Sequence, residues 1–180
     1  MMYKDNSLVP SEAIRLAALG LLAQQSRAYA DLARDIRHFT ARIAGPSLDL
    51  LGPSLELFKV EGLMEAHATN QKPDEQVMHL TETGRVEFRR LMTTKLRGPM
   101  GEVNKLIVAL KMHFLKLLPL DDQRAQLEML EEACDRELAR LGDLRAHHAE
   151  EKTPLLPWLD HEIDEVSARR AWFQRQRTAI

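Results

Sequence analysis

The chain has 180 residues, of which 44% are hydrophobic and 29% are charged, and its formal net charge is −2. This composition excludes a largely disordered protein, and an aromatic content of only 5% favours a mainly α-helical fold over a sheet-rich one. No apolar run approaches the ~20 residues that a membrane span needs, and the N-terminus lacks an apolar signal core. The single cysteine, Cys134, excludes an internal disulfide, so we expect a cytoplasmic protein that meets no membrane.

The charge is divided unevenly along the chain. Residues 1–97 contain 13 Lys and Arg against 12 Asp and Glu, whereas residues 98–180 contain 12 against 15. A protein that grips phosphates over its whole surface is usually strongly basic. The N-terminal half is therefore the better candidate for binding a nucleic acid.

Two helices are expected before residue 44. Ser11 can cap the first helix, whose apolar residues recur at helical spacing and predict a single apolar stripe. These residues are Ile14, Ala17, Ala18, Leu21 and Leu22. The second helix starts between Ser26 and Tyr29 and turns Leu32, Ala33, Ile36 and Phe39 to the core, with Arg34, Arg37 and His38 outward.

A third helix follows the loop at residues 44–48. Because proline is tolerated in the first turn of a helix, we expect the helix to begin near Gly52, with Pro53 in that turn. Leu55 and Phe58 should pack inward, and Gly62 supplies the stop.

A β-hairpin is expected next, with strands at residues 63–65 and 77–80 and a polar tip at about 68–75. Thr81 then opens another helix. The order helix, hairpin, helix is that of a winged helix-turn-helix, a motif that holds a helix in the major groove of DNA.

The glycines and proline at residues 97–101 interrupt the helical pattern. We therefore expect a winged-helix domain at 8–97 and a helical dimerisation domain at 98–180. A long helix carries an approximately heptad apolar stripe, which indicates a packing partner. This stripe consists of Leu127, Leu130, Cys134, Leu141 and Leu144. A final helix at about 159–177 follows, in which Ile163, Val166 and Trp172 could close the interface, and Cys134 is most simply a small core residue.

Four phrases in this order resemble the PadR family of bacterial transcriptional regulators. The first helix ends in Leu-Gly-Leu-Leu at 19–22, and the second is entered through Tyr29 and Leu32. The third ends in Glu-Gly-Leu at 61–63, and the hairpin is followed by Leu-Thr-x-x-Gly at 80–84. The resemblance covers about residues 8–92. The segment 165–176 is also similar to the family's last helix, with Trp172 in the place of its late tryptophan.

The resemblance implies a homodimer that binds double-stranded DNA at an inverted repeat, more readily as a repressor than as an activator. The position of each residue in such a fold suggests Ser47, Ser54 and Lys59 for base contacts and Lys72 for the wing. Arg27 and Arg34 would contact phosphates, and Tyr29 either contacts DNA or caps the core. The third helix departs from the family pattern, because Gly52-Pro53 keeps the family's proline but lacks its tyrosine, and Lys59 is its one basic residue.

The expected dimer and effector residues are Leu127, Leu130, Cys134, Leu141, Trp158 and Trp172. Some members of the family bind small aromatic effectors near the dimer centre, and tryptophans at such a seam either pack together or stack on a planar ligand.

Other functions find less support in the sequence. There is no phosphate-binding glycine loop, nucleophile elbow or HExxH phrase, so we expect neither an enzyme nor a cofactor. Adjacent helical residues such as His147 and His148 point about 100° apart and rarely share one metal ion, so no metal site is expected. The remaining alternative is a protein-interaction module, a winged helix that has lost DNA binding, which the acidic balance favours.

Overall fold

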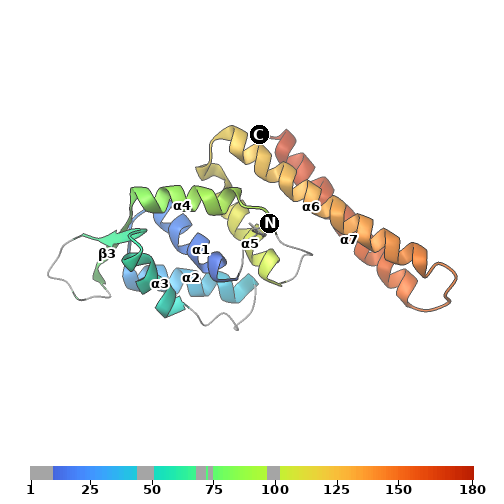
Figure 1. The fold of residues 1–180 in the computed structure, drawn as a ribbon, viewed down its shortest axis with the longest axis horizontal. Helices are drawn as coiled ribbons and strands as arrows, with labels where there is room; N and C mark the ends of the chain where they lie inside the picture. The colour runs from blue at the N-terminus through green and yellow to red at the C-terminus, as the bar shows by residue number, and fades with distance from the viewer. Residues whose placement is uncertain (1–9, 44–50, 68–71, 73–74, 97–101) are drawn as a thin grey trace, which may run out of the picture. The chain divides into compact units, whose positions relative to one another are not determined.

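The computed structural model describes residues 10–43, 51–67, 72, 75–96 and 102–180, which divide between two compact units. Unit 1 is Met1–Leu118 and unit 2 is Pro119–Ile180. Both are built mainly from helices, and the only strands among the described residues form one small sheet in unit 1 (Figure 1). The expected fold class, mainly α with a winged helix-turn-helix, is confirmed.

Unit 1 contains five α-helices among its described residues. They are α1 (Pro10–Gln24), α2 (Tyr29–Ile43), α3 (Leu51–Val60), α4 (Glu82–Thr93) and α5 (Glu102–Phe114), and the 3₁₀ helix η2 (Leu115–Leu117) follows α5. Pro53 lies in the first turn of α3, as expected. Helix α5, which the sequence placed in the second domain, packs against α1 and α2, so unit 1 extends beyond the expected boundary at residues 97 and 98.

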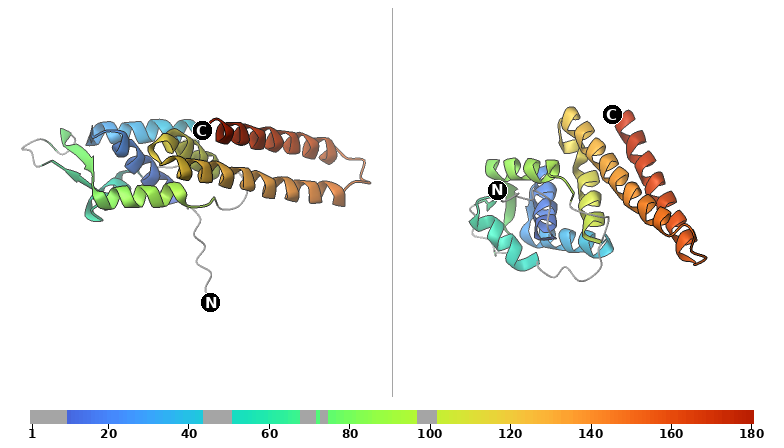
Figure 2. Two further views of the ribbon diagram at one scale, coloured as in Figure 1. Left: turned by 90° about the horizontal axis from the view of Figure 1, so that it is seen from above. Right: turned by 45° about the vertical axis from the view of Figure 1, so that its right-hand side comes forward.

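Helix α1 forms the centre of unit 1. It contacts all four other helices and strand β3, and Figure 2 shows these helices around it. Buried positions occur all round α1, where seven apolar side chains are at most 4% exposed: Ala13, Ile14, Leu16, Ala17, Ala18, Leu19 and Leu22. The expectation of a single apolar stripe was therefore wrong, because a helix surrounded on every side has no solvent face to keep polar.

The sheet has three antiparallel strands in the order β1-β3-β2. Strands β2 (Met64–Ala66) and β3 (Val77–Leu80) form the expected hairpin, with Met64 opposite Leu80. Strand β1 (Arg27–Ala28) pairs with the other edge of β3, with Arg27 opposite Met78. This third strand was not expected, because two residues carry no alternating pattern that could be recognised.

The turn between α3 and the wing depends on Gly62 and Gly84. Gly62 has a φ of +71°, a conformation that side chains other than glycine rarely adopt. A Cβ atom on Gly84 would lie 2.0 Å from the carbonyl oxygen of Leu63, so only glycine allows this approach. Thr81 caps α4 by accepting a hydrogen bond of 3.0 Å from the backbone N–H of Gly84. Glycine and threonine thus fix the start of α4 against the end of α3.

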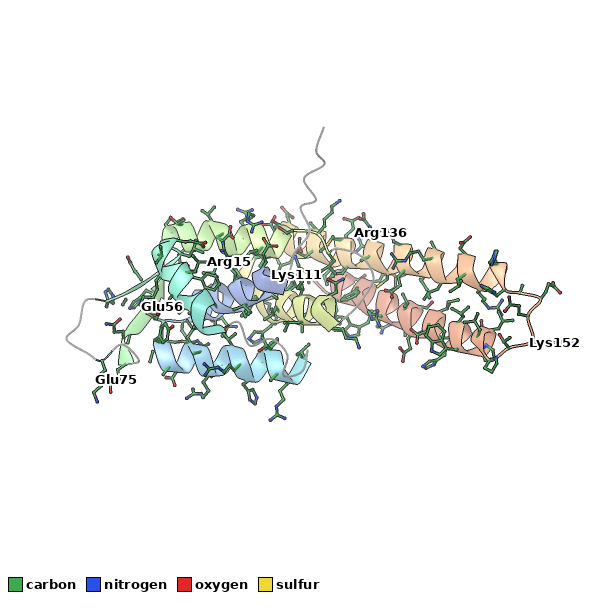
Figure 3. All side chains as sticks on the ribbon, turned by 60° about the horizontal axis from the view of Figure 1, so that its bottom comes forward. Arg15, Glu56, Glu75, Lys111, Arg136 and Lys152 are labelled. Carbon is green, nitrogen blue, oxygen red and sulfur yellow. The ribbon has the colours of Figure 1, made fainter. Side chains whose placement is uncertain are left out.

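Lys111 of α5 is completely buried within unit 1 (Figure 3). Its ammonium donates hydrogen bonds to the carbonyl oxygens of Leu91, Met92 and Thr94, with the bond to Thr94 at 2.8 Å. These oxygens lie at the C-terminal end of α4, where the helix dipole favours a positive charge. Burial nevertheless lowers the pKa of Lys111 to about 7.

Unit 2 is a hairpin of two long helices, α6 (Leu120–His147) and α7 (Leu155–Thr178). Six residues of the seam are at most 2% exposed: Leu127, Leu130, Cys134, Leu159, Val166 and Phe173. Glu131 pairs with Arg177 at 2.6 Å, and Arg145 pairs with Asp160 near the other end, which fixes an antiparallel register. Cys134 is a core residue, as expected, and burial raises the pKa of its thiol.

No helix in the described part of the chain is both long enough and apolar enough to cross a membrane.

Candidate nucleic-acid interface

Helix α3 is attached to the rest of unit 1 by two buried apolar side chains and one arginine. Leu55 and Phe58 are 0% and 2% exposed, as expected. The guanidinium of Arg15 lies over the ring of Phe58 at 5.2 Å from its centroid, and it pairs with Glu61 at 2.9 Å and with Glu87 at 3.2 Å. Arg15 therefore ties the end of α3 to both α1 and α4.

A second arginine, Arg90, adds ion pairs that hold α4 against α1. Arg90 pairs with Glu87 at 2.7 Å and with Glu12 of α1 at 3.0 Å. The hydrogen bond from Arg90 is the largest cause that lowers the pKa of Glu87, and the hydrogen bond from Arg15 acts in the same direction. These ion pairs thus hold α3, and with it the outward face of the helix, in a fixed position.

The outward face of α3 is apolar and acidic rather than basic. Leu57 is 49% exposed and Val60 is 83% exposed, whereas Glu56, which points away from the helix in Figure 3, pairs with Lys59 at 3.3 Å. Leu57 and Val60 are not among the residues that the sequence suggested for DNA contact. Their positions off the buried stripe of Leu55 and Phe58 are the signal that could have identified them.

Lys59 lies near Tyr29, so the structure brings two of the expected residues together. The ammonium of Lys59 is 5.7 Å from the centroid of the Tyr29 ring, a distance at which a cation interacts with the π electrons of the ring. Tyr29 is half-buried at the start of α2, and its backbone N–H donates to the carbonyl oxygen of Gln76 at 3.0 Å. Tyr29 therefore connects α2, α3 and the wing.

Two expected phosphate contacts are engaged by carboxylates in this structure. Arg27 pairs with Asp35 at 2.6 Å and is largely buried. Arg34 is 69% exposed and pairs with Asp31 at 2.7 Å and with Asp35 at 3.4 Å. A phosphate would have to compete with these carboxylates for either guanidinium.

The remaining expected contacts are dispersed. Lys72 is exposed on the wing, and Ser54 lies in the first turn of α3. Ser47 lies outside the described residues. On α2, Arg37 and Arg42 are exposed and form no ion pair among the described residues, which makes them additional candidates for phosphate contacts.

The wing carries a small polar cluster next to β1. Ser26 and His79 are joined by a hydrogen bond of 2.6 Å between Oγ and Nδ1, and the rings of His67 and His79 lie 4.0 Å apart between centroids. This cluster fixes the strand β3 to the residue just before β1. It helps to set the position of the wing relative to α2.

In unit 2, the structure separates the expected dimer residues into two groups. Leu127, Leu130 and Cys134 are buried against α7 of the same chain, and Leu141 is half-buried. Trp158 and Trp172 are 52% and 40% exposed. The side chain that closes the hairpin is Phe173, which lies next to Trp172 and is 2% exposed.

One surface group in the described part of the chain has metal-ligand geometry. The ligand atoms of His161, Glu162 and Glu165 lie within 4.8 Å of one another on α7. His161 and Glu165 form an ordinary surface pair at 3.5 Å with a spacing of four residues. His148 instead pairs with Glu151 at 2.6 Å.

Comparison with known proteins places this architecture in a family. A family model described as "Putative AphA-like transcriptional regulator" matches residues 3–176. No curated protein matches the chain.

Several solved structures are similar to the chain over most of its length. The PadR-like transcriptional regulator BC1756 from Bacillus cereus is 20% identical, with 92% of this chain and 94% of that chain covered and a TM-score of 0.41. PadR from Bacillus subtilis in complex with operator DNA is 16% identical, with 92% and 97% covered and a TM-score of 0.38. The same protein in complex with p-coumaric acid is 15% identical, with 96% and 98% covered and a TM-score of 0.40. The family match extends from before α1 almost to the end of α7, and the chain belongs to the family of AphA-like transcriptional regulators.

Proposed function

We propose that the protein is a cytoplasmic, homodimeric repressor that binds an inverted-repeat operator through α3 and the wing. The observation that carries the proposal is the exposure of Leu57 and Val60 on α3, beside the fully buried Leu55. Apolar side chains held in solvent on the helix that a winged helix directs into the major groove suit contact with the C5-methyl groups of thymine. Base readout would then rely on shape and methyl contacts more than on charge.

Phosphate contacts in this proposal come from the edges of unit 1. Arg37 and Arg42 on α2 and Lys72 on the wing are exposed cations, and the proposal assigns the contacts with the DNA backbone to them. Lys59 can exchange its pairing with Glu56 for a base or a phosphate. Because the proposed interface uses only a few ionic contacts per protomer, it does not require a strongly basic protein. A chain with a net charge of −2 could therefore bind DNA in this way.

Dimerisation would use the outer surface of unit 2. Trp158 and Trp172 on α7 and Leu120 and Leu144 on α6 are large apolar side chains that are at least 40% exposed. A two-fold axis at this surface would give each operator half-site one α3, with half-sites about one helical turn apart.

Fluorescence anisotropy of labelled duplexes tests the proposal. The full chain is titrated against DNA from its own upstream region and against a scrambled duplex, at several salt concentrations. Tight binding to one duplex that weakens with salt is expected, with each phosphate contact contributing about −0.9 to the slope of log K against log salt. If a genomic selection also yields no preferred DNA, the winged helix functions as a protein-interaction module instead.

A further inference from the structure

The small sheet of unit 1 has an inner face toward the core and an outer face. Met78 of β3 is buried on the inner face, so His79, the next residue, points to the outer face, because side chains alternate along a strand. Glu65 of β2 lies directly opposite His79. His67 follows two residues after Glu65 and extends the pairing, since its backbone N–H donates to the carbonyl oxygen of Val77 at 3.3 Å. Two imidazoles and one carboxylate therefore share the outer face.

The two histidine rings on this face are in contact. The centroids of His67 and His79 lie 4.0 Å apart, and the ring planes meet at 63°. Two imidazoles that bind one Zn²⁺ ion tetrahedrally, each at about 2.0–2.1 Å, have their ligating nitrogens about 3.4 Å apart. His67 is exposed just beyond the end of β2, so its ring can rotate to this spacing without disturbing the core. The backbone thus brings two nitrogen ligands within reach of one ion.

A hydrogen bond from the neighbouring strand orients the ring of His79. Its Nδ1 lies 2.6 Å from Oγ of Ser26, the residue before β1, on one side of β3. The two nitrogens of an imidazole point to nearly opposite sides of the ring, so Nε2 is directed toward β2 on the other side. When Nδ1–H donates to Ser26, Nε2 carries the free lone pair that a metal ion requires. Histidine ligands of metals are typically held by such a bond at the second nitrogen.

Nε2 of His79 is buried and has no hydrogen-bond partner among the described residues. A buried nitrogen without a partner is unfavourable, so a cation that accepts its lone pair would be stabilising. On β1, Arg27 lies opposite Met78 and pairs with Asp35 at 2.6 Å, so its positive charge is already compensated. Glu65 is exposed, and its side chain must turn toward the rings to bring its negative charge to the ion.

The donor set selects the class of ion. Imidazole nitrogens suit Zn²⁺, Ni²⁺ and Cu²⁺, whereas Mg²⁺ and Ca²⁺ prefer sites made of oxygen ligands. We propose that the outer face of the wing binds a divalent cation of the Zn²⁺ class through Nε2 of His79 and the imidazole of His67, with the carboxylate of Glu65 as a third ligand. The ion would link β2 to β3 and stabilise the hairpin. The site needs neither DNA nor a second protomer, so it is independent of the proposed function.

Isothermal titration calorimetry tests the site with zinc chloride and the full chain, without a histidine tag and after treatment with a chelator. We expect one Zn²⁺ ion to bind at the wing, and millimolar Mg²⁺ should not displace it. His67→Gln and His79→Gln should each weaken this binding at least ten-fold. Unchanged Zn²⁺ affinity in both variants, or displacement of Zn²⁺ by Mg²⁺, would overturn the proposal.

The matched control is His161→Gln, which removes the imidazole of the group on α7 that has metal-ligand geometry. This variant should bind Zn²⁺ at the wing as the unmodified protein does, whereas binding that disappears only in His161→Gln would place the ion on α7 and overturn the proposal. Glu65→Gln keeps the size of the side chain but removes its charge, so it should weaken binding. An unchanged affinity would exclude Glu65 as a ligand.

NMR of the histidine ring nitrogens locates the ion in the unmodified protein, where no variant has to fold. Long-range ¹H–¹⁵N spectra distinguish a ring nitrogen that carries a proton from one that donates its lone pair. On adding Zn²⁺, Nε2 of His79 should shift as a metal-bound nitrogen while Nδ1 stays protonated. Unchanged spectra of His67 and His79 at saturating Zn²⁺ would contradict the site.

Ser26 is a positioning residue in this site, since it reaches the ion only through His79. Ser26→Ala should weaken Zn²⁺ binding about ten-fold, as is typical when the hydrogen-bond partner of a metal ligand is removed. In the same variant, the ring spectra should show that His79 no longer favours the proton on Nδ1. A Ser26→Ala protein with unchanged affinity and an unchanged proton position would exclude this role.

Discussion

The hydroxyl of Thr81 donates a hydrogen bond of 2.6 Å to the carbonyl oxygen of Gly62. The hydroxyl oxygen of Thr81 also accepts a hydrogen bond from the N–H of Gly84, and the backbone N–H of Thr81 donates to the carbonyl oxygen of Leu63 at 3.2 Å. One side chain therefore joins the end of α3, the base of the wing and the start of α4. The position of α3 relative to the wing depends on this threonine.

Replacing Thr81 should test this joint. Thr81→Val keeps the shape of the side chain but removes the cap and the bond to Gly62, so we expect unit 1 to lose about 1–2 kcal/mol of stability. Thr81→Ser retains the hydroxyl and serves as the control. Urea unfolding followed by circular dichroism measures the difference, and equal midpoints for the two variants would show that the hydroxyl is not needed.

Lys111 should make the stability of unit 1 depend on pH. Its pKa of about 7 in the folded protein is below the usual lysine value of 10.5, so between these two pH values the unfolded chain binds more protons than the folded one. Stability should therefore rise with pH from about 7 to about 10.5, by at most about 1.4 kcal/mol per pH unit. Below pH 7 both states are protonated, and this contribution becomes constant.

Comparing the unmodified protein with the Lys111→Met variant isolates the contribution of Lys111 to the pH dependence of stability. The variant keeps most of the volume of the side chain but cannot titrate, so its stability should lack the rise that the unmodified protein shows. Thermal unfolding at intervals from pH 6 to pH 10 supplies both curves. Parallel curves would mean that Lys111 remains charged throughout this range.

Thymine methyl groups should contribute to operator affinity through Leu57 and Val60. Replacing operator thymines with uracil removes the methyl groups and should raise the Kd about four-fold for each methyl that α3 contacts, from about 0.8 kcal/mol per buried carbon. In the double variant Leu57→Ser, Val60→Thr, the same base change should have a much smaller effect. Equal sensitivity to uracil in both proteins would exclude methyl readout by these two residues.

Neighbouring aromatic residues on α7 should have separable roles. Phe173 is 2% exposed in the seam with α6, so Phe173→Ala should destabilise the hairpin by about 3–5 kcal/mol. Trp172 is 40% exposed, so Trp172→Ala should leave the hairpin folded and weaken the proposed dimer ten-fold or more. Sedimentation velocity over a range of concentrations and circular dichroism distinguish these outcomes. A Trp172→Ala protein that dimerises normally would remove this residue from the interface.

The sequence predicted the elements that have strong local signals. Thr81 followed three residues later by Gly84, Pro53 in a first turn, and a hairpin bounded by polar residues are all decided by short-range geometry. Leu55 and Phe58 were placed correctly because a surface helix has one buried stripe. For helix α1 the prediction of a single apolar stripe was wrong, because the periodicity of apolar residues does not reveal a helix that is covered on every side.

Features that depend on contacts between distant parts of the chain could not be predicted from the sequence. The strand β1 forms only because β3 lies beside it. The ion pair between Arg27 and Asp35 likewise forms only when the chain folds back at the start of α2. Adjacent side chains on a helix point about 100° apart, so an error of one residue in the assumed register of α7 assigns to Trp172 the buried position that Phe173 occupies. The stripe of Leu127, Leu130 and Cys134 correctly indicated a partner helix. The structure provides that partner within the same chain, in α7.

Both tryptophans of the chain lie on α7, in unit 2. Intrinsic indole emission therefore reports on the helical hairpin alone, whereas far-ultraviolet ellipticity reports on both units. Comparing the two signals during denaturation would show whether the units unfold together or one after the other, since coincident transitions are the mark of a single cooperative step. The placement of two side chains thus supplies a built-in, label-free probe for one half of the molecule.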